Sequence, residues 1–160
     1  MDRIEELRYL VLAAQREGSR RFTQALRPLG LTPAQAEVLT VLRTCGRPLA
    51  VRELGSLLVC ESGSPSRLAR TLVAAGLVES APDGADARVT RLRLTAAGST
   101  AARGVEHIER GFHAALAASL PDGAALDPLV DLLRGVASGG PAGQALARRR
   151  DLSVRSSTED

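Results

Sequence analysis

The chain has 160 residues, 44% of them hydrophobic and only 2% aromatic, and its 21 basic residues, all arginines, give a net charge of +3 and a pI near 9.6. This length accommodates one domain with tails, and the scarcity of aromatic residues leaves Leu, Val and Ala to fill a helical core. No apolar run is long enough to span a bilayer, no signal peptide is recognisable, and two cysteines make no disulfide framework, so we expect a cytoplasmic protein. The net positive charge permits nucleic-acid binding without requiring it.

The first two predicted elements are helices. Apolar residues at three- and four-residue steps predict a long amphipathic helix over residues 3–27. Thr32 followed by Pro33 is a typical helix start, because Thr caps free N–H groups and Pro is tolerated in the first turn. The second helix therefore runs from Pro33 to about Cys45. Its apolar positions are Ala36, Val38, Leu39, Val41 and Leu42.

A short third helix over residues 51–58 and a fourth helix after it form a predicted helix-turn-helix. Either Ser62 or Ser64 caps the fourth helix, and Pro65 directly after Ser64 favours Ser64. Gly76 ends this helix. Its inward residues are expected to be Leu68, Leu72 and Ala75, and its outward residues Arg67, Arg70 and Thr71.

A hairpin follows the helix pair. Its strands are predicted over residues 78–81 and 88–94, and the turn between them, residues 82–87, is rich in Asp and Ala and contains a Gly. A helix pair with an arginine-bearing hairpin fits DNA, because one helix fills a major groove while the hairpin reaches the neighbouring minor groove. The order of elements therefore predicts DNA binding.

Two further helices follow the hairpin. Thr95 caps the fifth helix, which continues to a Pro-Asp-Gly break at residues 121–123. The last predicted helix, residues 125–137, carries more apolar surface than a terminal helix of a monomer should expose, so we expect a partner surface to cover it. Residues 138–141 form a predicted linker, and residues 141–160 a polar C-terminal tail.

Five motifs occur in a characteristic order along residues 3–137. They are Leu31–Leu39, Leu54–Leu58, Leu68–Val78, Asp86–Arg88 and Leu92–Gly98. Their order and spacing resemble the MarR family of bacterial winged helix-turn-helix regulators. The turn over residues 59–65 departs from that pattern, because it carries a Cys and an early Pro where the family has a simpler Gly-Val-Ser-like turn.

The resemblance implies a mainly α fold with a small β-hairpin wing and dimerisation helices from both termini. Residues 1–30 and 95–140 would form the dimerisation region, and residues 31–94 the winged helix-turn-helix. It also implies a homodimeric transcription regulator, a repressor on a pseudo-palindromic double-stranded DNA operator, released by a small-molecule effector.

Candidate DNA-binding residues gather near the start of the fourth helix. They are Ser62, Ser64, Ser66, Arg67 and Arg70. Hydroxyl and guanidinium groups there reach base edges and phosphates, and Arg suits guanine O6 and N7. A helix N-terminus itself favours a phosphate. The alternative for these residues is a capped helix with a solvated face. Arg52 on the third helix is a further candidate for a phosphate contact.

The hairpin supplies a second group of candidates, Asp86, Arg88 and Arg91. Arg88 follows the turn, and an arginine in a minor groove is attracted by the negative potential of narrow A·T tracts. Asp86 would hold Arg88 by an ion pair, in line with the Asp-x-Arg wing motif of the family. The alternative for this pair is a surface salt bridge of little energetic weight. Arg91 is either a DNA contact or a solvated charge.

Other functions have weaker support. By resemblance alone, Tyr9, Arg16, Arg20 and Phe112 are candidates for an effector pocket. Cys60 and Cys45 leave a redox-responsive regulator open, since Cys60 lies near a helix N-terminus, where a thiol pKa can fall. A metal-responsive regulator and a winged-helix protein-interaction module without DNA binding are further alternatives. No catalytic motif or zinc spacing is present, so we expect no enzyme, no metal and no cofactor.

Overall fold

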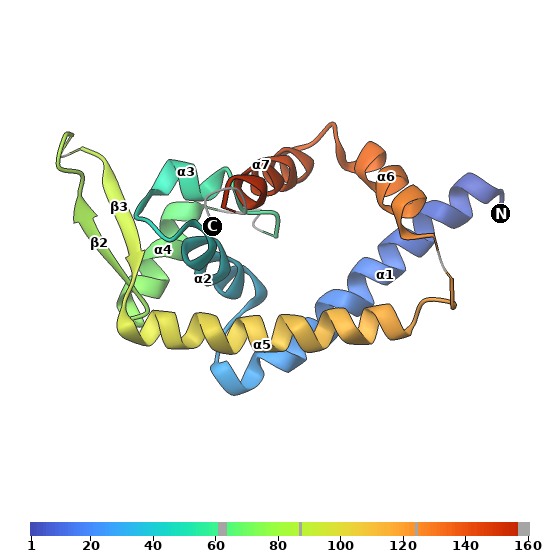
Figure 1. Cartoon of the computed structure of the whole chain (residues 1–160), viewed down its shortest axis with the longest axis horizontal. Coiled ribbons are helices and arrows are strands. Elements are labelled where there is room, and N and C mark those ends of the chain that lie inside the picture. Colours follow the sequence, from blue (N-terminus) through green and yellow to red (C-terminus); the bar gives the residue numbers. More distant parts are fainter. Residues whose placement is uncertain (61–63, 87, 124, 157–160) are drawn as a thin grey trace.

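The computed structural model describes residues 1–60, 64–86, 88–123 and 125–156. This part of the chain is mainly helical with one small antiparallel sheet (Figure 1). The helices are α1 (Arg3–Leu26), a 3-10 turn η1 (Arg27–Leu29), α2 (Pro33–Cys45), α3 (Val51–Gly55), α4 (Pro65–Ala74), α5 (Ala96–Ala118), α6 (Leu126–Ala137) and α7 (Pro141–Ser156). The strands are β1 (Leu49–Ala50), β2 (Val78–Pro82) and β3 (Thr90–Leu94). The predicted mainly α fold with a hairpin wing is confirmed.

Local signals explain where α2 begins and ends. The Thr32 hydroxyl accepts a hydrogen bond from Gln35 N at 3.3 Å, and the Gln35 side chain accepts one from Thr32 N at 2.9 Å. This reciprocal capping box satisfies two N–H groups that the helix itself leaves free. Gly46 ends α2 in the left-handed region, at φ 62°, which a glycine adopts without a steric penalty.

The hydrophobic core lies between α2, the helix pair α3–α4, the sheet and the first half of α5. Strand β3 lies in the middle of the sheet, with β1 and β2 antiparallel on either side. Leu92 of β3 faces Leu49 of β1, and both side chains are almost completely buried. The largest side chains under 2% exposed are Leu26, Val38, Leu39, Leu49, Leu54, Leu72, Val78, Leu92 and Val105.

A rigid joint connects the end of α4 to the start of α5. The Thr95 hydroxyl donates to Gly76 O at 2.7 Å and accepts from Gly98 N at 2.9 Å, while Thr95 N donates to Leu77 O at 3.1 Å. A Cβ built at Gly98 would lie 1.8 Å from Leu77 O, so only glycine permits this approach. The direction of α5 is thereby set relative to α4 and the hairpin.

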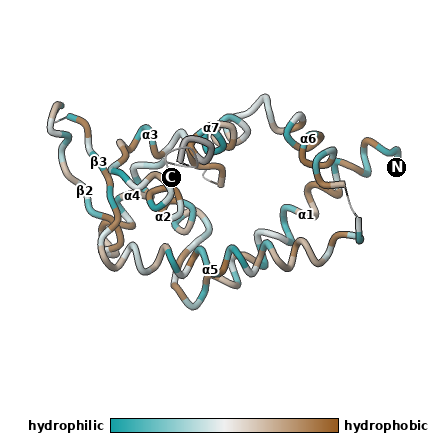
Figure 2. Tube along the Cα trace, viewed as in Figure 1, coloured by the Kyte–Doolittle hydropathy of each residue, from teal (hydrophilic) through white to brown (hydrophobic). Residues whose placement is uncertain are grey.

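The other end of the molecule is an extended arm (Figure 1). Helices α1 and α5 cross and run away from the winged-helix body, and α6 lies at that far end. Hydrophobic residues continue along α1 and α6 (Figure 2), and many of them are exposed. On these two helices they include Ile4, Leu10, Val11, Leu12, Leu126, Leu129, Val130, Leu132, Leu133 and Val136, and Leu116 of α5 is exposed as well. Among the described helices, none has the length and apolar character needed to cross a membrane.

Three details differ from the sequence prediction. The third helix ends at Gly55 and continues as a turn, so it is shorter than residues 51–58. On α4, Ala75 is exposed and Ala69 is buried in its place, because the helix ends at Ala74 and Ala75 is its C-cap. The polar segment from Pro141 forms α7, which folds back onto the winged-helix body.

Candidate nucleic-acid interface

The helices α3 and α4 meet in a close contact between Gly55 and Pro65. A Cβ built at Gly55 would lie 2.7 Å from Pro65 Cγ, so glycine allows this approach without a shift of the proline ring. Ser64 caps α4, since its hydroxyl accepts from Arg67 N at 3.4 Å, and Pro65 occupies the first turn. Ser64 is therefore the cap, as Pro65 predicted. The other candidate, Ser62, lies outside the described residues.

The outward face of α4 carries polar and basic side chains. Leu72 and Ala69 are buried in the core, and this burial sets the rotation of the helix about its axis. Ser66, Arg67 and Arg70 are consequently exposed. Within the described residues neither arginine forms an ion pair. Both guanidinium groups are therefore available to bases or phosphates.

Asp83 organises the turn of the wing. Its Oδ1 accepts from Ala85 N at 2.8 Å and from Asp86 N at 3.2 Å, and its Oδ2 accepts from Arg91 Nε. Asp83 N in turn donates to Val89 O at 2.8 Å, which extends the pairing of β2 and β3. The Arg91 hydrogen bond, followed by the two N–H groups, holds the pKa of Asp83 below its usual value.

Asp86 and Arg88 form the predicted ion pair. Arg88 Nε donates to Asp86 Oδ1 at 3.0 Å and Arg88 Nη2 donates to Asp86 Oδ2 at 3.1 Å, a two-point contact that orients the guanidinium plane. The hydrogen bond from the Arg88 side chain lowers the pKa of Asp86. The Arg88 side chain is nevertheless 90% exposed. It is thus oriented without being covered, on a hairpin that projects from the body (Figure 1).

The remaining candidate arginines differ in their surroundings. Arg91 is committed to Asp83 and is only 38% exposed, so its side chain holds the turn. Arg93, two residues further along β3, pairs with Glu79 of β2 at 2.7 Å. Arg52 on α3 is exposed and forms no ion pair with any residue that the structure describes. Of these three, Arg52 is the one without an ion pair among the described residues.

An open groove of about 600 Å³ joins α4 to the wing. It brings Ser66 and Arg70 of α4 together with Ser80 and Thr90 of the hairpin. The other lining residues are Val51, Ala69, Val73, Ala74 and Leu92. The helix and the hairpin therefore share one continuous surface, with a basic residue of each exposed.

The two cysteines have environments that oppose thiolate formation. Partial desolvation of the sulfur, and after it the nearby carboxylate of Glu37, raises the pKa of Cys60. The fall in this pKa that a nearby helix N-terminus can cause is outweighed here, because desolvation and a negative charge act in the other direction. Burial raises the pKa of Cys45 in the same way. Both cysteines are free, and the raised pKa of each favours the thiol over the reactive thiolate.

The four residues proposed for an effector pocket, Tyr9, Arg16, Arg20 and Phe112, form no hydrogen bond, ion pair or ring contact with one another. The Phe112 ring packs edge-on against Phe22, with 5.6 Å between ring centroids. Arg20 pairs with Glu17 at 2.8 Å on the surface of α1, and Tyr9 lies under the guanidinium of Arg8 at 4.1 Å. Arg16 is exposed on the same helix. In the part of the chain that the structure describes, no group of three His, Cys, Asp or Glu residues is placed to hold a metal ion.

Sequence reasoning missed one buried charge, Glu37 on α2. Its side chain is 7% exposed, and its carboxylate accepts from Val59 N at 2.8 Å, Cys60 N at 2.9 Å and Arg149 Nη1 at 2.7 Å. The available signal was its position, since Glu37 interrupts the inward row of Ala36, Val38 and Leu39. A charged residue at a core position requires partners, and here these come from the turn before α4 and from α7.

Residues 31–98 match the family model of a winged helix DNA-binding domain. A cysteine-to-serine variant of MarR from E. coli, crystallised with operator DNA, is 27% identical with a TM-score of 0.72, covering 86% of this chain and 99% of that one. MepR from S. aureus in a DNA complex is 20% identical with a TM-score of 0.71, covering 81% and 96%. The organohalide-sensing regulator RdhR, in a 2,4-dichlorophenol-bound form, is 18% identical with a TM-score of 0.74, covering 86% and 82%. No curated protein matches the chain.

Proposed function

We propose that this chain, a winged-helix DNA-binding transcription regulator of the MarR type, binds a pseudo-palindromic operator as a homodimer in the cytoplasm and represses transcription there. The observation that carries the proposal is the exposed surface formed by α4 and the wing. The side chains of Arg67 and Arg70 extend from α4 without an ion pair among the described residues. Arg88 extends from the hairpin, and its ion pair with Asp86 orients its guanidinium group. A repressor acts here by occupying the operator.

In this proposal α4 is the recognition helix. Its exposed face enters a major groove, where Arg67 or Arg70 reads guanine O6 and N7, and Ser66 contacts a base or phosphate. The capped N-terminus of α4 at Ser64 favours a nearby phosphate. Arg52 contributes a phosphate contact from α3. Base contacts supply the sequence preference, and phosphate contacts supply affinity and position.

The wing enters the adjacent minor groove. Arg88 is the group that reaches the base edges there, since it is the most exposed of the charged residues in the hairpin's ion pairs. Asp86 aligns the guanidinium before binding, and Arg91 with Asp83 keeps the turn in shape. Because A·T and T·A pairs look alike in the minor groove, Arg88 responds to groove width and not to base identity.

The homodimer is formed by the arm of α1, the second half of α5 and α6. The support is the set of large apolar side chains left exposed there, such as Leu10, Leu129 and Leu133. Monomeric proteins rarely expose contiguous apolar surface of this kind, and a two-fold partner would cover it. A two-fold dimer presents two recognition helices, which predicts half-sites about one helical turn apart.

The proposed repressor is released from its operator by a small-molecule effector. RdhR has been crystallised with a dichlorophenol, so a small aromatic molecule is the ligand class to test first. We place it where α1 meets α5, with Phe112 as the apolar contact and Arg16 or Arg20 facing an anionic group. Tyr9 lies further along α1, on the arm. Binding there would release the operator by changing the geometry of the arm.

Selection of DNA from a random pool by the purified protein tests the function. We expect an enriched pseudo-palindrome, a footprint over both half-sites, and affinity that falls steeply with salt as counterions are displaced. Protection of one asymmetric half-site at full occupancy would contradict the docking. No enrichment at any salt concentration would favour the protein-interaction module.

A further inference from the structure

We propose that α7 positions the recognition helix, and that Glu37 and Arg149 are the residues through which it does so. This inference rests on the operator binding proposed above. It assigns a role to the C-terminal segment, which folds as a helix against the winged-helix body and lies outside the surface assigned to DNA.

Glu37 holds the turn that leads into α4. Its two carboxylate oxygens accept from the backbone N–H groups of Val59 and Cys60, five and four residues before the N-cap Ser64. Because an ionised carboxylate at 7% exposure has lost most of its hydration, it requires a cation or several N–H donors close by. The positions of Val59 and Cys60 are therefore tied to the groups that neutralise the Glu37 carboxylate.

The cation comes from α7, across more than a hundred residues of sequence. Arg149 Nη1 donates to Glu37 Oε1 at 2.7 Å, the same oxygen that accepts from Val59 N. The Arg149 side chain is itself 31% exposed, so this ion pair is largely withdrawn from solvent. Removing one member of such a pair is far more damaging than removing a surface charge, because the other member stays buried without its counterion.

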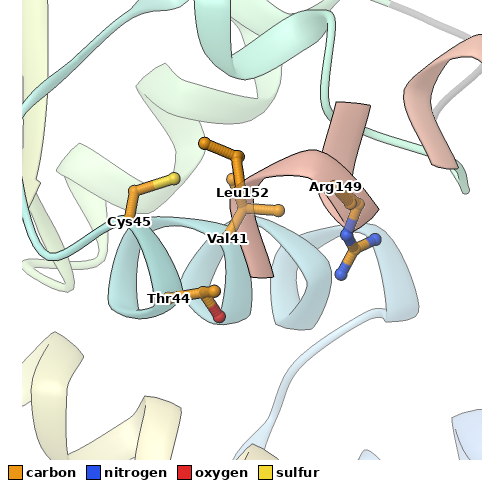
Figure 3. A pocket seen from close by; sticks show the side chains of 5 residues that line it. All are labelled: Val41, Thr44, Cys45, Arg149 and Leu152. Atoms are coloured by element: carbon orange, nitrogen blue, oxygen red, sulfur yellow. The ribbon is translucent and has the colours of Figure 1, made fainter. Parts of the chain in front are cut away.

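Apolar and polar contacts fasten α7 on either side of this pair. Ala145 is buried at 2% exposure, and Leu152 packs against the core and lines one pocket with Val41 and Cys45 of α2 and with Arg149 (Figure 3). Arg148 Nη1 donates to Ser56 O at 3.2 Å, at the start of the same turn. The docked helix thus contacts α2, the end of α3 and the turn, and among the described residues no hydrogen bond or ion pair joins it to a side chain proposed to touch DNA.

The corner between α6 and α7 connects the docked helix α7 to the arm. A Cβ built at Gly143 would lie 2.0 Å from Ala137 O, so the corner between α6 and α7 is closed as tightly as the joint at Gly98. The recognition helix is therefore connected to the arm through α6, α7 and Glu37 in addition to α5. Fixing the turn before binding reduces the conformational freedom that operator binding must remove, which favours affinity.

The test compares Arg149→Ala with Arg150→Ala in the full-length protein. Arg150 is exposed on the same helix, so its loss removes the same charge without touching Glu37. We expect Arg149→Ala to weaken binding to the selected operator about 3- to 30-fold, the range typical of residues that couple distant elements. Arg150→Ala should stay within about twofold of wild type, and Arg149→Lys, which keeps the charge and one donor, should restore most of the affinity.

A second readout needs no DNA. In the free protein, the N–H groups of Val59 and Cys60 should exchange with solvent faster in Arg149→Ala than in Arg150→Ala, with circular dichroism and oligomeric state unchanged in both. Glu37→Gln should match Arg149→Ala, and the double variant should be no worse than either single variant, because the two residues act as one unit.

The outcomes separate the two proposals. If wild type binds the operator and Arg149→Ala binds it equally well, the positioning role is wrong, whatever the exchange rates show. Equal exchange in Arg149→Ala and Arg150→Ala would also overturn it. If wild type binds no DNA at all, the proposed function fails first, and the positioning role fails with it.

Discussion

The carboxylate of Asp86 holds Arg88 by three hydrogen bonds, two from the guanidinium and one from the Arg88 backbone N–H at 3.0 Å. One residue therefore fixes both the side chain and the peptide of the arginine proposed to enter the minor groove. Since both partners are exposed, the pair adds little to folding stability, and its role is one of orientation.

Arg88→Ala should weaken operator binding most where the sequence flanking the half-sites is A·T-rich, because a narrow minor groove attracts the guanidinium. Dimerisation and thermal stability should be nearly unchanged. Fluorescence anisotropy on operators with A·T-rich and G·C-rich flanks measures the difference. Asp86→Asn keeps the size of the side chain but loses the charge, and should give a smaller loss of the same kind. Equal affinity of wild type and Arg88→Ala on A·T flanks would leave α4 as the only reader.

Arg67→Ala or Arg70→Ala should relax the sequence preference at one base position, at a cost of about 1–3 kcal/mol for the preferred base. The reason is that a bidentate contact to guanine is lost with the guanidinium. Repeating the random-pool selection with each variant identifies the position. Uniform weakening on all sequences for both variants would mean that the two arginines contact phosphates only.

Gly98→Ala should destabilise the fold by about 3 kcal/mol or more, since the new Cβ collides with a backbone carbonyl that cannot move independently. Gly111→Ala in the same helix is the matched control. A Cβ at Gly111 meets nothing within 4 Å, so this variant should gain up to about 1 kcal/mol from helix propensity. Thermal unfolding of both proteins gives the comparison. A Gly98→Ala protein as stable as wild type would show that the backbone at Leu77 can shift to make room for the new Cβ.

Leu129→Asp together with Leu133→Asp should give monomers or unfolded protein, because two charges would enter the apolar face of α6. Both leucines are at least 40% exposed in the single chain, which is why we assign them to the dimer interface. Asp131→Ala on the same helix serves as the control. Sedimentation at micromolar concentration provides the measurement, and a well-folded wild-type monomer there would contradict the assignment.

Cys60 should react slowly with iodoacetamide at neutral pH, and its reaction should accelerate only above the pH at which an ordinary thiol ionises. The raised pKa keeps the group as the unreactive thiol, since desolvation and Glu37 both oppose the thiolate. In Glu37→Gln the midpoint should move to lower pH. Mass spectrometry in a Cys45→Ser background follows the single site. A thiol more reactive than a free cysteine would support redox regulation instead.

The starts of α2, α4 and α5 were predictable because each carries its own local signal. Ser64 and Pro65 mark the start of α4, Thr32 and Pro33 mark the start of α2, and Thr95 marks the start of α5. Each pair or cap acts within one helical turn, so tertiary structure is not needed to recognise it. The pairing of Asp86 with Arg88 is local in the same sense.

The docked position of α7 was not predictable from the pattern. Its contact with the body depends on Leu152, which packs against the core, and on Arg149, which resembles its neighbours Arg148 and Arg150 in sequence. The ion pair of Asp83 with Arg91 was missed for a related reason. The two come together only through the register that places Pro82 opposite Thr90, which depends on how the seven intervening residues turn.

Because the hydrogen bonds of Thr95 fix the start of α5, a rotation of this helix moves α4 and the hairpin with it. A helix of 23 residues is about 35 Å long, and its near end is clamped to the recognition helix and the hairpin. A rotation of such a rod by about 5° about its far end moves the near end by about 3 Å, close to the ~3.4 Å that one base pair advances along the axis of a DNA duplex. In the proposed dimer, a rotation of the arm by a few degrees would therefore be enough to shift the recognition helix relative to its half-site.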